Sequence, residues 1–363
     1  MHRWERFVFR FDKQFISMGA LKSISGKEIS SSLIHGLLKF ITGDAPLLRE
    51  FEVSSADTPF YQEWQWLPNA PASDSLVLPG LRTLTLQHTP FKWSSPMLRT
   101  GLTTLNLRAL PTAHLPLDRI LYIIANNSDL QSLTLHFHGV LPAILPLAPT
   151  TLHRLTTFSI GGHYFLSQLV DSLCLPALDT LTLDIEAREP IEDTISSLLL
   201  RSSYPALKHL AVAYGSSSAS ASFYYGPSGI VISWMALLGE LAGLRTLHIG
   251  GTPLEPLLAA LGPPEEDASN QTGTWACPHL EALGMRNCHT HSEGVAKLVQ
   301  MVEARNPDGG GSGAAGSGGP VRLKALELYD CATLGQDVVQ WLKGRIEEVV
   351  CTEPAYERCV PFF

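Results

Sequence analysis

The chain has 363 residues, of which 45% are hydrophobic, so it is long enough and apolar enough to bury a large core. It has 26 Lys and Arg residues against 34 Asp and Glu, a net charge of −8, and its basic residues do not cluster along the sequence. Proteins that bind nucleic acid usually carry a basic patch, and a membrane-spanning helix needs about 20 apolar residues in a row. The sequence has neither feature, so we expect no nucleic-acid partner and no membrane span.

The amino terminus and the cysteines indicate a reducing compartment. Residues 1–6 are charged and lead into only a short strand-like stretch, which is not the pattern of a secretory signal peptide. None of the six cysteines forms a Cys-x-x-Cys pair, and a chain of this length does not need disulfides to fold. The sequence therefore predicts reduced thiols and a cytoplasmic or nuclear location.

One motif recurs twelve times: an apolar residue, two further residues, a second apolar residue, one further residue and a third apolar residue. The clearest copies begin at Leu81, Leu102, Leu130, Leu178 and Leu323. Variants begin at Leu155, Leu207, Leu244 and Leu280, and weaker copies begin at Trp4, Leu48 and Ile346. From Leu81 to Leu178 the successive spacings are 21, 28, 25 and 23 residues. These spacings lie in or near the range of about 20–29 that is typical of leucine-rich repeats.

The motif predicts a short strand in each repeat, because its last two apolar positions stand two apart and face the same side. Apolar residues at helical spacing predict helices between strands, at 34–41, 117–124, 234–241 and 295–302. Parallel strands joined by helices cross over in the right-handed sense. We therefore predict an α/β fold, a right-handed leucine-rich repeat solenoid with a curved parallel sheet on the concave side and helices and loops on the convex side.

We expect residues 1–363 to form a single solenoid of about twelve irregular repeats, because the repeat phase continues through every insertion. One repeat cannot fold alone: burying six aliphatic side chains contributes about 10–15 kcal/mol, whereas ordering 25 residues costs about 1–2 kcal/mol each. Flexible insertions are predicted near 215–229, 262–276 and 306–320, which are rich in Gly, Ser, Ala, Pro or acidic residues. The aromatic residues of segment 57–76 are expected to cover the convex side of the core.

No motif in the sequence points to catalysis. Gly311, Gly313 and Gly316 match a dinucleotide-binding pattern, but they follow a predicted helix instead of a strand and are interpreted as a linker. His289 and His291 lack a third metal ligand nearby. His136 and His138 alternate at a strand end, and we expect them to face opposite ways. The sequence thus predicts a non-enzymatic protein with no catalytic, metal-binding or cofactor-binding residues and no cofactor.

Two cysteines frame one of the repeats. Cys277 and Cys288 fit the pattern C-x-x-L-x-x-L-x-L-x-x-C with Met285 in the last leucine position, and Cys331 repeats its second half. A small apolar thiol fits the corner at which a strand leaves for its helix. We therefore expect these cysteines to have a packing role.

The cysteine pattern, the irregular repeats and the ending Ile346–Pro354 resemble the cysteine-containing leucine-rich repeats of fungal F-box-like proteins. In that family the repeats select a substrate and an amino-terminal F-box docks on the adaptor of a cullin-type ubiquitin ligase. The segment Leu115–Leu121 has a leucine-proline opening like that of an F-box, but it lies between two repeat strands and is predicted to be a repeat helix. The resemblance therefore implies a ubiquitin-ligase link only if an F-box lies upstream of this chain.

These features together predict a protein-recognition module resembling the substrate-binding part of an F-box ubiquitin-ligase adaptor. A free-standing repeat scaffold or regulator without a ubiquitin connection is the first alternative, and an enzyme built on a repeat scaffold is the second. We expect a protein partner on the concave face, where Arg and Tyr are frequent binding anchors. The predicted protein-binding residues are Arg6, Arg10, Glu50, Glu52, Gln87, Arg108, His136, Asp184, Glu327 and Tyr329.

Overall fold

The computed structural model describes residues 4–11, 47–55, 79–88, 93, 96–111, 113–186, 191–213, 233–264, 274–288, 293–308, 319–331 and 334–352. Several predicted features lie outside these residues. They are the helix at 34–41, the aromatic segment, the insertion at 215–229, most of the other two insertions, the glycine motif at 311–316, and His289 with His291.

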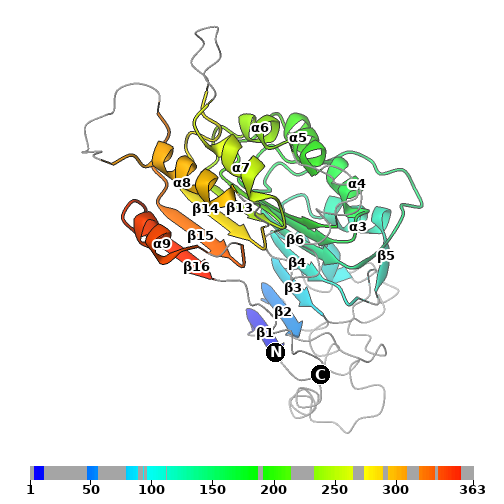
Figure 1. The fold of residues 1–363 in the computed structure, drawn as a ribbon. Coiled ribbons are helices and arrows are strands. Elements are labelled where there is room, and N and C mark those ends of the chain that lie inside the picture. Colours follow the sequence, from blue (N-terminus) through cyan, green and yellow to red (C-terminus); the bar gives the residue numbers. More distant parts are fainter. Residues whose placement is uncertain are drawn as a thin grey trace, which may run out of the picture. The chain divides into compact units, whose positions relative to one another are not determined.

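The fold is α/β, and its main feature is a twelve-stranded parallel sheet whose strands follow one another in chain order (Figure 1). The chain divides into two compact units, Met1–Leu178 with Leu200–Pro205 (unit 1) and Asp179–Leu199 with Ala206–Phe363 (unit 2). Each unit contributes six strands to the sheet. The predicted single solenoid spanning the whole chain remains a prediction.

Unit 1 contains short helices and two small additional sheets besides its six main strands. The main strands are β1 (Arg6–Phe11), β2 (Glu50–Ser55), β3 (Thr83–Gln87), β4 (Thr104–Arg108), β6 (Ser132–Phe137) and β9 (Thr157–Gly162). The helices are the 3-10 helix η1 (Pro96–Arg99), α3 (Leu117–Ala125) and α4 (Leu166–Asp171). The additional sheets pair β5 (His114–Pro116) with β7 (Gly139–Leu141), and β8 (Thr150–Thr151) with β10 (Leu173–Cys174).

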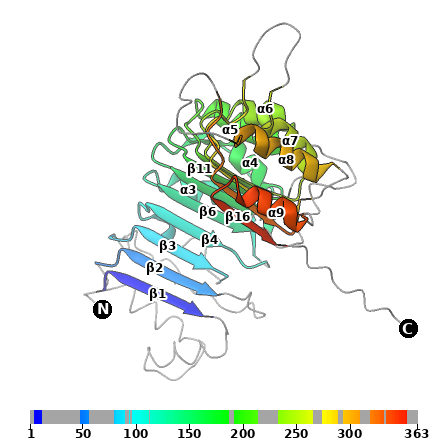
Figure 2. The ribbon, with the colours of Figure 1, turned by 60° about the vertical axis from the view of Figure 1, so that its left-hand side comes forward.

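Unit 2 alternates strands and helices more regularly. Its strands are β11 (Thr180–Ile185), β12 (His209–Val212), β13 (Thr246–Gly250), β14 (Ala282–Arg286), β15 (Ala325–Tyr329) and β16 (Glu348–Thr352). Its helices are α5 (Ile191–Arg201), of which the last two residues belong to unit 1, α6 (Trp234–Gly239), α7 (Leu254–Leu261), α8 (Gly294–Arg305) and α9 (Gln336–Lys343). Helices α6 to α9 pack one against the next on one side of the strands of unit 2 (Figure 2).

All twelve copies of the repeat motif coincide with the twelve strands of the sheet, so the predicted strands are confirmed. The pairing keeps the motif in register: Leu84 of β3 lies beside Leu105 of β4, and Leu105 lies beside Leu133 of β6. All three leucines have no exposed surface. The strands therefore stack equivalent motif positions into continuous rows, with the leucines buried on one face of the sheet.

Several strands end in the same backbone corner. The residue after the strand has a positive φ at His88 (50°), Asn287 (49°) and Asp330 (52°), and Gly251 adopts 61° at the equivalent place. The His88 and Asn287 amides donate to carbonyl oxygens of the next strand, each at 2.8 Å. Gly, Asn and Asp tolerate this left-handed conformation better than other residues, which explains their use where the chain turns off the sheet.

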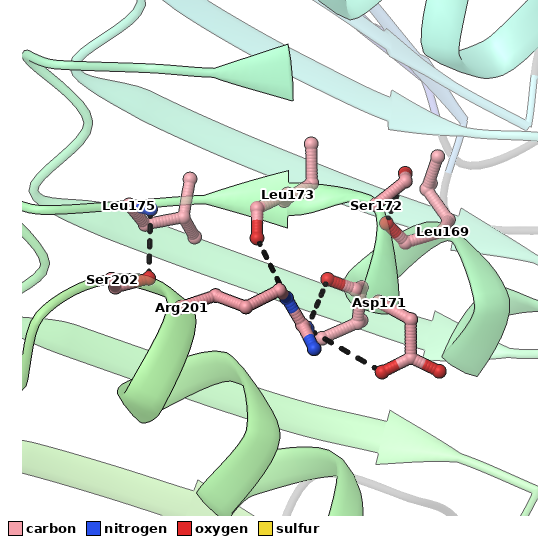
Figure 3. A network of polar contacts seen from close by, with 8 residues as sticks. Leu169, Asp171, Ser172, Leu173, Leu175, Arg201 and Ser202 are labelled. Carbon is pink, nitrogen blue, oxygen red and sulfur yellow. Dashed lines mark hydrogen bonds and ion pairs between the residues drawn. The ribbon is translucent and has the colours of Figure 1, made fainter. Parts of the chain in front are cut away.

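Polar side chains near helix ends join one repeat to the backbone of another (Figure 3). Arg201, the last residue of α5, donates to the Leu173 carbonyl at 3.4 Å and pairs with Asp171 at 3.4 Å. The Ser202 hydroxyl accepts the amide of Leu175 at 2.8 Å. These bonds satisfy backbone groups that no regular ladder reaches, and they hold the helix end of one repeat on the loop of the preceding one.

Candidate functional site

The candidate site is the set of strand side chains that alternate with the buried leucine rows, which we call the polar face of each unit. In unit 1 it comprises Arg6, Val8, Arg10, Glu50, Glu52, Ser54, Thr83, Thr85, Gln87, Thr104, Asn106, Arg108, Ser132, Thr134, His136, Thr157, Ser159 and Gly161. In unit 2 it comprises Thr180, Thr182, Asp184, His209, Ala211, Thr246, His248, Gly250, Ala282, Gly284, Arg286, Ala325, Glu327, Tyr329, Glu348, Val350 and Thr352. The structure places all ten predicted binding residues on these faces, seven in unit 1 and three in unit 2.

Four of the predicted residues form two ion pairs with one another. Arg6 pairs with Glu50 at 2.8 Å, and the Arg10 guanidinium makes two bonds to the Glu52 carboxylate, at 2.5 and 2.9 Å. The hydrogen bond from Arg10 holds the pKa of Glu52 below its usual range, and Ser54 adds a further bond at 3.1 Å. Because these charges are already compensated within the chain, β1 and β2 offer a partner little net charge.

A basic cluster follows on the next strands of the same face. The register places Gln87 of β3 beside Arg108 of β4, and Arg108 beside His136 of β6. Arg108 is exposed, and among the described residues its guanidinium has no ion pair or hydrogen bond. We call Arg108, His136, His138 and His88 the basic cluster, because the charges of the other three each act on His136.

His136 is partly buried within this cluster. Burial lowers its pKa to about 4, and the charges of His138, Arg108 and His88 act in the same direction. The ring is therefore neutral at physiological pH. The His136 and His138 rings lie 4.8 Å apart at 73°. The expectation that they face opposite ways was wrong, because side chains two apart on an extended chain share one side.

Asn106 adds an unusual feature beside this cluster. It lies two residues before Arg108 on β4, between Thr85 and Thr134 of the neighbouring strands. Its Oδ1 atom is buried and has no hydrogen-bond partner among the described residues. A buried acceptor without a donor costs free energy, so the Asn106 oxygen has an unfilled hydrogen-bonding position in the protein alone.

The polar face of unit 2 carries a second group of charged and aromatic side chains. The Arg286 guanidinium lies 5.1 Å from the centre of the Tyr329 ring, a cation–π arrangement. The register places Gly284 between His248 and Glu327. Burial lowers the pKa of His248, and the Glu327 carboxylate opposes this shift. Asp184 lies at the end of β11, near the start of unit 2.

Several residues of these clusters were absent from the predicted set. His248 and Arg286 occupy the same strand positions as Thr85 and Gln87, so applying the repeat register to every strand would have found them. His138 follows from the same alternation, one step beyond the end of β6. His88 could not be found this way, because it joins the cluster only through the left-handed corner that follows β3.

The thiols of Cys277 and Cys331 are poor nucleophiles. Cys277 and Cys288 are buried, and burial raises the pKa of Cys277 to about 12. Cys288 shares a hydrogen bond with Cys331, which raises the pKa of the Cys331 thiol. Neither Cys277 nor Cys331 is therefore a thiolate at neutral pH.

Within the described ranges, no group of three or more His, Cys, Asp or Glu side chains is placed to hold a metal ion. None of the helices described has the length and apolar character needed to cross a bilayer. No protein-family model matches the sequence, and no curated protein is significantly similar to it.

Proposed function

We propose that the chain is a non-enzymatic protein-recognition module that binds its partner on the polar face of the sheet. The observation that supports this proposal most is the row of unlike side chains, Gln87, Arg108 and His136, held in register on strands whose other face is a leucine core. A rigid sheet that presents varied polar groups is suited to selecting one partner among many.

In this proposal the repeats form a curved, right-handed leucine-rich repeat solenoid with the polar face on its concave side. The module corresponds to the substrate-binding part of an F-box ubiquitin-ligase adaptor and acts in the cytoplasm or nucleus. The cysteine pattern supports this comparison, because Cys277 and Cys288 pack at the two ends of one repeat and are both buried.

The test is an affinity purification with the full chain as bait, followed by mass spectrometry. A double variant, Arg108→Glu with Asp184→Lys, reverses two charges on the polar faces while keeping the net charge. Its matched control is Arg119→Glu with Glu303→Lys, which reverses two exposed charges on helices α3 and α8.

A partner that the wild type and the control retain, and that the polar-face variant loses, supports the proposal. A partner lost only with the helix variant shows that the binding surface lies elsewhere. The ubiquitin connection is tested separately: an in-frame F-box in the coding sequence upstream of residue 1 would support it, and the absence of an F-box there would favour the free-standing scaffold.

A further inference from the structure

The polar face of unit 1 carries positive charge that no carboxylate of the described residues neutralises. Its only carboxylates among the described residues, Glu50 and Glu52, are bound to Arg6 and Arg10. Strands β3, β4, β6 and β9 bring no Asp or Glu to this face. Within the described part of this face, the basic cluster therefore has no acidic neighbour on strands β3, β4, β6 and β9, on a chain whose net charge is −8.

The side chains around Arg108 suit a carboxylate. A guanidinium presents two parallel N–H donors that match the two oxygens of a carboxylate, and Arg108 is exposed and unpaired in the described part of the chain. Gln87 adds an amide donor on one side, and His138 adds an imidazole beyond His136. At the next position in this row β9 has Gly161, which has no side chain to cover His136.

The unpartnered Oδ1 atom of Asn106 suits a ligand that also donates a hydrogen bond. Its side-chain amide makes no hydrogen bond in the described structure, so rotation about its last side-chain bond can turn the oxygen outward without breaking one. Alternate residues of a strand are about 7 Å apart. One peptide can therefore place an acidic side chain on Arg108 and a neighbouring backbone N–H on Asn106 at the same time. A peptide supplies both groups, whereas a simple anion supplies only the first.

Nucleic acid fits this surface less well. Its affinity comes from many phosphate contacts along a basic track, and here one Arg and three His residues stand on an acidic chain. The polar-face residues of β3, β4, β6 and β9 include no Phe, Tyr or Trp to stack a base.

We propose that the polar face of unit 1 binds an extended acidic segment of a protein partner, with an Asp or Glu carboxylate on Arg108 and a backbone N–H donated to Asn106. Gln87 and His138 flank the carboxylate. This inference rests on the proposed function and narrows the partner to one that carries an acidic peptide.

The test is a selection of displayed random 12-residue peptides on the immobilised full chain, read by sequencing. Wild type is compared with Arg108→Glu and with the matched control Arg119→Glu, an identical charge change on helix α3. One enriched peptide is then synthesised with a fluorescent label, and its Kd is measured by anisotropy for these chains and for Arg108→Gln and Asn106→Ala. Circular dichroism checks that every variant keeps the wild-type thermal midpoint.

The wild type and Arg119→Glu should both enrich Asp and Glu, and Arg108→Glu should lose this enrichment. The Kd of the labelled peptide should rise about tenfold or more for Arg108→Glu, less for Arg108→Gln and Asn106→Ala, and should rise with salt.

Equal acidic enrichment by Arg108→Glu, or no acidic enrichment by the wild type, overturns the inference. Two competition results would also overturn the inference. One is displacement of the labelled peptide by a 12-nucleotide RNA at a lower concentration than the unlabelled peptide requires, and the other is its displacement by inorganic phosphate at such a concentration. Selection of non-acidic peptides that the Arg108→Glu and Asp184→Lys double variant fails to bind would overturn this inference while leaving the proposed function intact.

Discussion

Asn127 shows how single polar residues hold neighbouring repeats together. It is fully buried, yet its side-chain amide accepts the Leu102 amide at 2.9 Å and donates to the carbonyls of Leu98 (2.7 Å) and Ile123 (2.8 Å). Buried polar groups are tolerated where every bond is made, and removing one partner leaves the others unsatisfied. Asn306 makes a comparable set of bonds to Leu323 and Arg345.

Asn127→Ala should therefore lower the free energy of unfolding by about 2–4 kcal/mol in urea titrations, because three backbone groups lose their partner. The adjacent Asn126 is a matched control: it is exposed and donates only to the Tyr122 carbonyl. Asn126→Ala should cost less than about 1 kcal/mol. Equal losses for the two variants would show that the buried bonds contribute nothing beyond those at the surface.

His136 makes stability depend on pH in the acid range. Its pKa in the folded protein is about 4, mainly because of burial, against an ordinary value of 6.5. Below about pH 6.5 the His136 imidazole therefore binds a proton in the unfolded chain, whereas in the folded chain it does so only near pH 4. The contribution to stability is fully present above pH 6.5 and is lost as the pH falls through this window.

Comparing pH 7 with pH 5 isolates this effect. The wild type should lose more free energy of unfolding between these values than His136→Gln, by roughly 1–2 kcal/mol. Arg108, His138 and His88 remain in the variant, so the difference between the two chains reports His136 alone. Identical losses for the two chains would mean that His136 titrates normally in the folded protein.

At the scale of secondary structure, the strands were predictable and several other elements were not. Each strand repeats one apolar spacing, so even irregular copies such as the one at Trp4 give a recognisable signal. Helix α7 is apolar on nearly every side, and α4 has only six residues, so neither shows a clear helical period. The small sheets β5–β7 and β8–β10 use two or three residues a strand, too few for any period to appear.

The candidate site was predictable in position but not in pairing. Strand alternation placed Arg10 and Glu52 on one face, but their bond is diagonal, because the register sets Arg10 beside Ser54. Which long side chains meet depends on their rotamers, and the sequence does not contain that information. The basic cluster likewise needs the corner at His88, a backbone conformation that no sequence period signals.

The phase of the strands can be tested on β6. Leu133 is completely buried, and its neighbour Thr134 lies on the polar face. Leu133→Ala should lower the free energy of unfolding by about 2–5 kcal/mol because it leaves a cavity, whereas Thr134→Ala should cost less than about 1 kcal/mol. A larger loss for Thr134→Ala than for Leu133→Ala, measured by urea denaturation, would contradict the assigned phase.

The turn after β9 depends on a glycine. Gly162 has a φ of 101°, and a Cβ at this position would lie 2.1 Å from the Phe137 carbonyl oxygen. Gly162→Ala should therefore shift the thermal midpoint down by several degrees, since both the conformation and the close contact exclude a side chain. At Gly239, the last residue of α6, a Cβ would meet nothing within 4 Å, so Gly239→Ala should leave the midpoint unchanged or raise it. A Gly162→Ala chain that melts like the wild type would contradict this account of the turn.

At the scale of the whole molecule, every main strand carries the same motif while the polar faces differ along the chain. In unit 1 the face passes from ion pairs on β1 and β2 to the basic cluster around Arg108 of β4 and His136 of β6, which has no ion pair among the described residues. In unit 2 it combines Arg286, Tyr329, His248 and Glu327. The leucine rows maintain the fold, so we expect substitutions on the polar face to cost little stability.

The most direct test of recognition on the polar face is site-specific photo-crosslinking in cells. A benzophenone amino acid is placed at Thr134 on the polar face of unit 1, which leaves Arg108 in place, or, as the control, at Arg119 on helix α3, and captured proteins are identified after irradiation. We predict that position 134 captures a discrete partner whose crosslinked peptide is rich in Asp and Glu, and that position 119 does not capture it. Capture of the same partner at position 119 and not at 134 would contradict the claim that the polar face recognises the partner.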